Sequence, residues 1–118
     1  MSVRCQMGFY HEDKTLGDYE VLIYRHNDGE PENVLEDIIP ILKDFKENRP
    51  YPEDVEYSAA WLISKLKNTY TDIGVGKKLQ GDIEYYYAIY PGRVDVYDTE
   101  ASSLSKLEEF KKIDTVEI

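Results

Sequence analysis

An arginine, a histidine and an aspartate lie close together where an apolar run of the sequence ends, at Arg25, His26 and Asp28. A guanidinium group and an imidazole can bind a phosphate, and a histidine near a carboxylate can act as a general base. The same segment reads Asn27-Asp28-Gly29, which is typical of a turn, and Asp28 could cap a following helix. The residues therefore allow a small site, and they equally allow a structural corner between a strand and a helix.

A further arginine, Arg4, joins this group if the first two strands pair. Apolar residues alternate with other residues over positions 3–9, which predicts a half-buried strand. After a polar interruption, the β-branched and aromatic residues of segment 19–26 predict the second strand of a hairpin. If the hairpin closes near Lys14, facing residues have numbers that sum to about thirty, so Arg4 comes close to His26. The predicted site comprises Arg4, Arg25, His26 and Asp28, of which Arg4, His26 and Asp28 are the catalytic candidates.

The sequence lacks the local patterns that mark common catalytic or metal sites. It contains no HExxH, CxxC or GxSxG motif. The two histidines, His11 and His26, fall at opposite ends of the predicted hairpin and are not expected to share a metal ion. We therefore expect no metal and no cofactor. The single cysteine, Cys5, cannot form an intramolecular disulfide, and its place in the first strand predicts a buried thiol in a reducing compartment.

Composition predicts one domain over residues 1–118 and excludes several classes of function. Fourteen basic and 24 acidic residues give a net charge of −10, which repels the phosphate backbone and argues against direct binding to duplex nucleic acid. No apolar run approaches the length of a membrane span or a signal peptide. We expect a protein of the cytoplasm, or of the host cytoplasm if it is viral, that does not bind membranes.

Two helices are predicted in the middle of the chain, and they carry most of the negative charge. The first begins near Pro31, with a kink or a break at Pro40, and the second covers residues 52–70. Between residues 28 and 56, ten acids stand against three bases. This charge could simply solvate two helix faces, or it could dock on a basic protein and mimic a nucleic-acid backbone. The residues expected to bind such a partner are Glu32, Glu36 and Asp37.

The C-terminal part of the sequence predicts a second hairpin and a short helix. Segment 71–82 reads as a loop, and segment 83–98 as a hairpin about Pro91-Gly92 with a bulge or a longer loop. A helix is expected over residues 102–112, with Leu104, Leu107 and Phe110 on its apolar side. The predicted fold is α+β in the order ββααββα, with an antiparallel four-stranded sheet and helices packed mainly on one face.

Tyrosines are concentrated in the second hairpin. Strand alternation sends Tyr85 and Tyr87 to one face of the sheet and sends Tyr86, Tyr90 and Tyr97 to the other, so one set lies away from the helices. The second set could bind a partner or form a homodimer through the sheet, since tyrosine combines a large contact area with a polar tip. Two alternatives are that the tyrosines only shield a half-exposed sheet, or that they stack nucleic-acid bases, for which the interleaved acids have the wrong charge.

Three stretches together resemble a family of small uncharacterised proteins of phages, prophages and archaeal or bacterial genomes. They are the start "MSVR", the segment "IYRHNDGEPENVL" and the segment "DIGVGKKLQGDIEYYYAIY". Members of that family tend to open Met-Ser-Thr-Arg and to carry Tyr-Arg-His-x-Asp-Gly-x-Pro-Glu. Here Val3 replaces the threonine, and the matching positions are Tyr24, Arg25, His26, Asp28, Gly29, Pro31 and Glu32. The resemblance implies a viral or mobile-element context and no particular activity.

These observations favour a non-enzymatic acidic interaction protein, and the viral or mobile-element context that the resemblance implies makes it a virus- or phage-encoded modulator of a host protein. The expected partner is a protein, for example one that handles nucleic acid. The alternative is a small enzyme or phosphate-ligand-binding protein that uses the end of the first hairpin.

Overall fold

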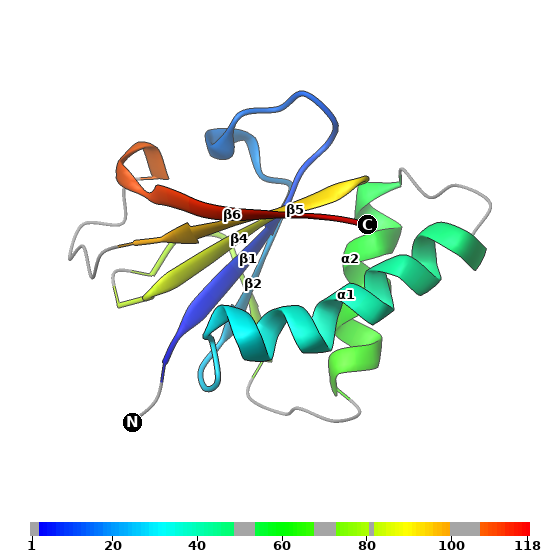
Figure 1. Cartoon of the computed structure of the whole chain (residues 1–118), viewed down its shortest axis with the longest axis horizontal. Helices are drawn as coiled ribbons and strands as arrows, with labels where there is room; N and C mark the ends of the chain where they lie inside the picture. Colours follow the sequence, from blue (N-terminus) through cyan, green and yellow to red (C-terminus); the bar gives the residue numbers. More distant parts are fainter. Residues whose placement is uncertain (1–2, 49–53, 68–72, 81, 100–106) are drawn as a thin grey trace.

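Two helices cover one face of a six-stranded sheet in the computed structural model of the chain (Figure 1). The structure describes residues 3–48, 54–67, 73–80, 82–99 and 107–118. Among these residues no helix is both long enough and apolar enough to cross a membrane. In chain order the elements are β1 (Cys5–Phe9), η1 (Leu16–Asp18), β2 (Val21–Arg25), α1 (Pro31–Asn48), α2 (Val55–Lys67), β3 (Ile73–Gly76), β4 (Tyr85–Tyr90), β5 (Arg93–Asp98), η2 (Leu107–Glu109) and β6 (Lys111–Glu117), where η marks a single 3₁₀ turn.

The strand order is β3-β2-β1-β4-β5-β6, and all neighbours are antiparallel except the central pair β1 and β4, which is parallel. The parallel pair arises because β3 and β4 run in the same direction: the connection between them passes back over β1, where Lys78 and Gln80 form hydrogen bonds with the Gln6 side chain. The α+β class is confirmed. The predicted order ββααββα and the antiparallel four-stranded sheet are wrong.

Both missed strands lie at the edges of the sheet. β3 falls in the segment expected to be a loop, because Gly74 and Gly76 disfavour a strand; an edge position tolerates them better than a central one. β6 begins at Lys111, where the final helix was expected to end, and its charged residues suit an exposed edge. That predicted helix is replaced by the single turn η2, and residues 100–106, Leu104 included, lie outside the described residues.

The sequence predicted the register of the first hairpin correctly and the turn of the second hairpin incorrectly. The first has the expected register, with Cys5 opposite Arg25, so facing residue numbers do sum to thirty. The second is tighter than expected, because Tyr90 pairs directly with Arg93 across Pro91-Gly92. No glycine of the described residues has a positive φ angle, so this turn is not of type II. The expected bulge is absent there, and a register shift occurs instead between β5 and β6.

α1 begins at Pro31 as predicted, because proline suits the first helical position. It continues to Asn48 with Pro40 inside it, so of the predicted kink or break at Pro40 the break does not occur. Pro40 lies on the exposed side of the helix, where water can satisfy the carbonyl that loses its donor. The residues of α1 and α2 that enter the core are Val34, Ile38, Leu42, Phe45, Val55, Ala59, Leu62 and Leu66.

Both faces of the sheet are covered. The surface under α1 and α2, here called the helix face, presents Met7, Ile23 and Tyr87 to the core. The opposite surface, here called the tyrosine face, lies under the connection between β1 and β2 and under η2 (Figure 1). Its buried and partly buried residues are Tyr10, Leu22, Tyr24, Ile83, Tyr86, Ala88, Tyr90, Tyr97, Leu107 and Phe110.

Strand alternation therefore predicted the correct face for the tyrosines, and the expected openness of that face is wrong. Tyr86 is fully buried, Tyr90 is 5% exposed and Tyr97 is half-buried. Leu16 and Tyr19 from the first connection pack on this face together with Phe110. A partner or a second copy cannot reach the ring of Tyr86 while these segments are in place.

Candidate functional site

The predicted site at the end of the first hairpin is divided between the two faces of the sheet. Side chains alternate along a strand, so Arg4 and His26 lie on the tyrosine face while Arg25 lies on the helix face. On the tyrosine face, Arg4 forms an ion pair with Asp82 at 3.4 Å, and the Tyr24 hydroxyl lies 3.0 Å from Nδ1 of His26. Burial raises the pKa of Tyr24, and the charge of Asp82 raises it further. Arg4 and His26 thus both lie beside Tyr24 and are separated from Arg25.

On the helix face, Arg25 is held by its own structural partners. Its side chain is 2% exposed, Nη2 lies 2.8 Å from Oδ2 of Asp37, and Nε donates a hydrogen bond to the carbonyl of Asn27 at 3.0 Å. A shallow surface depression beside it is lined by Arg25, Asp28, Asn33, Glu36 and Asp37. Three carboxylates thus surround one guanidinium that already has an anionic partner. This arrangement disfavours a phosphate ligand.

Asp28 and Gly29 form the turn that joins β2 to α1. Asp28 has a φ of 56°, a left-handed conformation that aspartate tolerates better than most residues. The Gly29 amide donates to the carbonyl of Val3 at 2.9 Å, and the Tyr87 hydroxyl donates to the Gly29 carbonyl at 2.6 Å. A Cβ atom at Gly29 would lie 2.8 Å from the Val3 carbonyl oxygen, so this close approach requires glycine.

The alternative expectation, that Asp28 caps α1, is wrong. The carbonyl of Glu30, not of Asp28, accepts the first helical hydrogen bonds, from the amides of Asn33 and Val34 at 3.0 and 2.9 Å. Glu30 therefore occupies the position before the first helical residue, Pro31. Asp28 is a turn residue whose carboxylate lies at the rim of the depression.

The carboxylates of α1 form the largest charged surface that the sequence predicted. Five acids of this helix have exposed side chains, and the nearby bases are Lys43 and Lys46. Lys46 donates a hydrogen bond to the carbonyl of Ile118 at the C-terminus. The five acids, here called the acidic face, are Glu32, Glu36, Asp37, Asp44 and Glu47.

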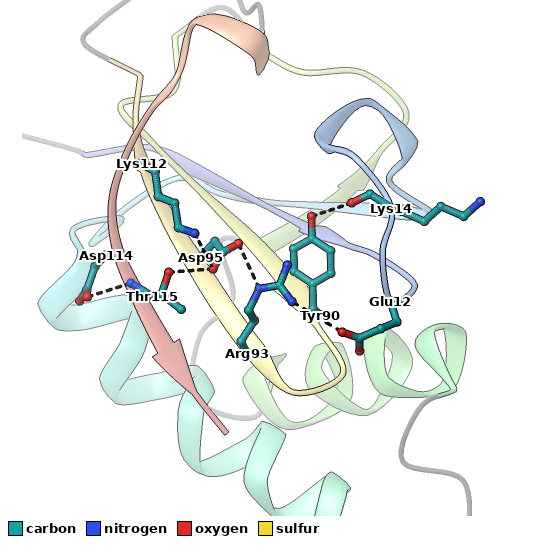
Figure 2. A network of polar contacts seen from close by, with 8 residues as sticks. All are labelled: Glu12, Lys14, Tyr90, Arg93, Asp95, Lys112, Asp114 and Thr115. Carbon is teal, nitrogen blue, oxygen red and sulfur yellow. Dashed lines mark hydrogen bonds and ion pairs between the residues drawn. The ribbon is translucent and has the colours of Figure 1, made fainter.

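Sequence reasoning missed a buried carboxylate, Asp95, at the centre of a polar network on the tyrosine face (Figure 2). Asp95 is 3% exposed. Its carboxylate accepts a hydrogen bond from the Thr115 hydroxyl at 3.0 Å and lies 3.3 Å from Nε of Arg93 and 3.5 Å from Nζ of Lys112. The alternation of "RVDVYD" places Arg93 and Asp95 on one face, which is a signal for the pair, but β6 was not predicted.

Arg93 extends this network to the first connection of the chain (Figure 2). Its guanidinium lies 3.9 Å from the centre of the Tyr90 ring, and Nη1 lies 3.7 Å from Oε1 of Glu12. The Tyr90 hydroxyl donates to the carbonyl of Lys14 at 3.0 Å. The network therefore connects β5 both to the edge strand β6 and to the segment that covers the tyrosine face, which is a structural function.

Comparison with known proteins assigns no function to the acidic face or to the network around Asp95. No protein-family model, no curated protein and no solved structure matches this chain. Within the described parts of the chain, no three residues among His, Cys, Asp and Glu are grouped so that they could hold a metal ion. The resemblance to small phage and prophage proteins stays a prediction, and function has to be argued from the surfaces themselves.

Replacing Asp95 by alanine should destabilise the fold by about 2 kcal/mol, because three partners lose their common acceptor. Hydrogen exchange should also show faster exchange of the β6 amides, since Lys112 and Thr115 lose their side-chain link to β5. The control is Glu117→Ala, which removes an exposed carboxylate of the same strand outside the network and should change stability by less than about 0.5 kcal/mol. Equal unfolding curves for the two variants would contradict the assignment.

Proposed function

We propose that this protein is a non-enzymatic interaction protein that binds a positively charged protein surface through the acidic face of α1. Support comes from the charge pattern of the helix. Glu32 and Glu36 are both exposed and four residues apart, a spacing at which like charges repel. No basic residue lies three or four positions from either of them. Glu32 suits the positive N-terminal end of the helix, but neither acid has an oppositely charged partner within the helix, and this pattern suits a surface that a basic partner neutralises.

Within the acidic face, the first two turns of α1 provide the contact region. Asp37 is half-exposed, at 42%, but it already faces Arg25, so much of its charge is compensated within the fold. Farther along, Lys43 lies four residues before Glu47 and offsets part of the negative charge there. Glu32 and Glu36 therefore carry the least compensated charge, and they are the residues on which a partner would depend most.

The chemistry of the acidic face indicates the class of partner. Exposed carboxylates in a row resemble the charge of a nucleic-acid backbone, and such a surface attracts lysine- and arginine-rich proteins and speeds their association. A protein that handles nucleic acid presents such a surface. With the viral or mobile-element context that the family resemblance implies, the protein would act in the host cytoplasm as a modulator of a host protein of this kind.

Charge reversal at Glu32 and Glu36 should weaken partner binding by at least about tenfold, which corresponds to about 1.4 kcal/mol. The experiment compares the wild type with the double variant Glu32→Lys/Glu36→Lys in affinity capture from host-cell lysate, followed by quantitative mass spectrometry. Both side chains are exposed, so the variant should keep its circular dichroism spectrum and its unfolding midpoint.

The matched control is Glu109→Lys/Glu117→Lys, which changes the net charge by the same amount at exposed positions outside α1. It should retain the partner. If both double variants lose the partner equally, only net charge matters and the acidic face is not the contact; if neither does, the proposal is wrong.

The alternative function, an enzyme or phosphate-binding protein at Arg4, Arg25, His26 and Asp28, has less support. Arg4 and His26 face away from the helices, whereas Arg25 and Asp28 border an acidic depression on the other side. His26→Ala should leave partner capture unchanged, whereas a ligand-dependent function would be lost in this variant.

A further inference from the structure

α2 carries a second stripe, mostly apolar and partly exposed, in addition to the one that enters the core. The stripe residues Tyr57, Ala60, Trp61 and Ser64 line an open surface depression and follow the spacing i, i+3, i+4 and i+7 of one helix side. Tyr57 is 63% exposed, which is unusual for a large aromatic side chain. The opposite side of α2 is buried under the sheet. A helix with two apolar sides has more apolar surface than its own domain covers.

We infer that a second copy of this chain covers the stripe, so that two α2 helices pack antiparallel across a twofold axis. The stripe alternates large and small residues about a midpoint between Ala60 and Trp61. In the antiparallel arrangement, Tyr57 of each copy lies over Ser64 of the other, and the two Trp61 rings, which are on the same side of the stripe, lie beside each other across the axis. The Tyr57 ring therefore meets a small residue, which allows the two helices to approach closely at both ends of the stripe.

The charges that flank the stripe suit the same arrangement. Exposed Glu56 lies near the N-terminal end of α2, and exposed Lys67 at its C-terminal end lies eleven residues later, on the same side of the helix. Residues on the same side meet in an antiparallel helix pair, so each Glu56 faces Lys67 of the other copy. On the other side of the stripe, Lys65 lies eleven residues after Asp54, a half-buried residue just before α2 whose carboxylate also accepts a hydrogen bond from the Tyr57 amide. A parallel pair would bring like charges together instead.

The aromatic residues of the stripe are partly ordered before association. The Trp61 ring lies 6.2 Å from the ring of the buried Phe45, centre to centre, and Nζ of Lys65 lies 4.8 Å from the centre of the Trp61 ring. Such ordering lowers the entropic cost of binding. A dimer of this kind would present two copies of the acidic face, which goes beyond the proposed function and would add avidity for a repetitive basic partner.

The test is analytical ultracentrifugation of the full chain over a wide concentration range. The wild type should sediment as a reversible dimer. Ala60→Arg places a long charged side chain at the midpoint of the stripe, on the exposed side of the helix, and should weaken the dimer by at least about tenfold while the circular dichroism spectrum stays unchanged. Lys43→Glu, on the exposed side of α1, is the control and should leave the dimer intact.

A charge exchange makes the test specific for the antiparallel arrangement. Glu56→Lys alone and Lys67→Glu alone should each weaken the dimer several-fold, because each places like charges opposite each other. The double variant Glu56→Lys/Lys67→Glu should restore it to within about twofold. A wild type that stays monomeric at all concentrations, a dimer that Ala60→Arg leaves unchanged, or a foreign protein bound to the stripe of a monomer would each overturn the inference.

Discussion

Gly8→Ala should destabilise the fold by about 3 kcal/mol or more and leave little folded protein at physiological temperature. Gly8 lies in the central strand β1, and the ring of Tyr86 from the neighbouring strand lies directly over it. A Cβ atom at this position would overlap the Tyr86 hydroxyl and lie 2.9 Å from Cζ of that ring and 3.1 Å from a ring carbon of Tyr10. The ring cannot move aside easily, because the Tyr86 and Tyr10 hydroxyls share a hydrogen bond of 2.6 Å.

The measurement is urea unfolding at neutral pH, with Gly17→Ala as the matched control. A Cβ atom at Gly17 would have no atom within 4 Å, so that variant should stay within about 0.5 kcal/mol of the wild type. Tyr86→Ala is destabilising on its own, but the double variant Gly8→Ala/Tyr86→Ala should lose less stability than the sum of the two single variants. Additive losses would show that the two residues are not in contact.

The second large effect expected is cooperative unfolding in alkali. Burial raises the pKa of the Tyr10, Tyr86 and Tyr87 hydroxyls well above the ordinary range, and all three side chains have no exposed surface. Burial also raises the pKa of the Cys5 thiol to about 12. A tyrosine in the unfolded chain has a pKa of about 10. The folded state therefore holds these protons more tightly than the unfolded state does.

The sign of the effect follows from this difference. The stabilisation is fully present below pH 10 and is lost as the pH rises above the pKa of the unfolded chain, because only the unfolded state then releases its protons. Each group contributes about 1.4 kcal/mol per pH unit, so the three tyrosines together give about 4 kcal/mol per pH unit. Against a stability of about 5–15 kcal/mol, the protein should unfold roughly between pH 11 and pH 13.

Far-ultraviolet circular dichroism and tyrosinate absorption measured together test this prediction. The last part of the absorption change should coincide with the loss of secondary structure, because the buried tyrosines ionise only on unfolding. Tyr86→Phe should reduce the slope of stability against pH by about 1.4 kcal/mol per pH unit. Full ionisation of all eleven tyrosines with the circular dichroism spectrum intact would contradict the burial of these three.

The sequence predicted which residues face each other in the first hairpin, but it misled us about what they could do together. The alternation from Val3 onward specified the register, and Arg4 and His26 both lie beside Tyr24. The four predicted residues do not form one site, because consecutive strand residues point to opposite faces of the sheet. Arg25 therefore pairs with Asp37 on the helix face, away from His26. The prediction grouped residues that are close in the sequence, although the same alternation that predicted the strand places neighbouring residues on opposite faces of the sheet.

The tyrosine face illustrates what the sequence could not predict. The alternation correctly separated Tyr86 and Tyr90 from Tyr87. The cover of that face consists of single 3₁₀ turns and irregular segments, in which residues such as Tyr19 and Phe110 have no repeating pattern. β6 was missed for a related reason, since an edge strand with charges at both ends lacks the apolar alternation of an inner strand.

The most direct test of the central claim, that the acidic face of α1 binds a basic protein, is affinity capture of the tagged protein from host-cell lysate at low and at high salt. We predict a stoichiometric partner that handles nucleic acid, bound at low salt and largely released at high salt, because exposed charges are screened within about 10 Å at 0.1 M salt. A partner that is retained equally at both salt concentrations, or no stoichiometric partner at either, would contradict it.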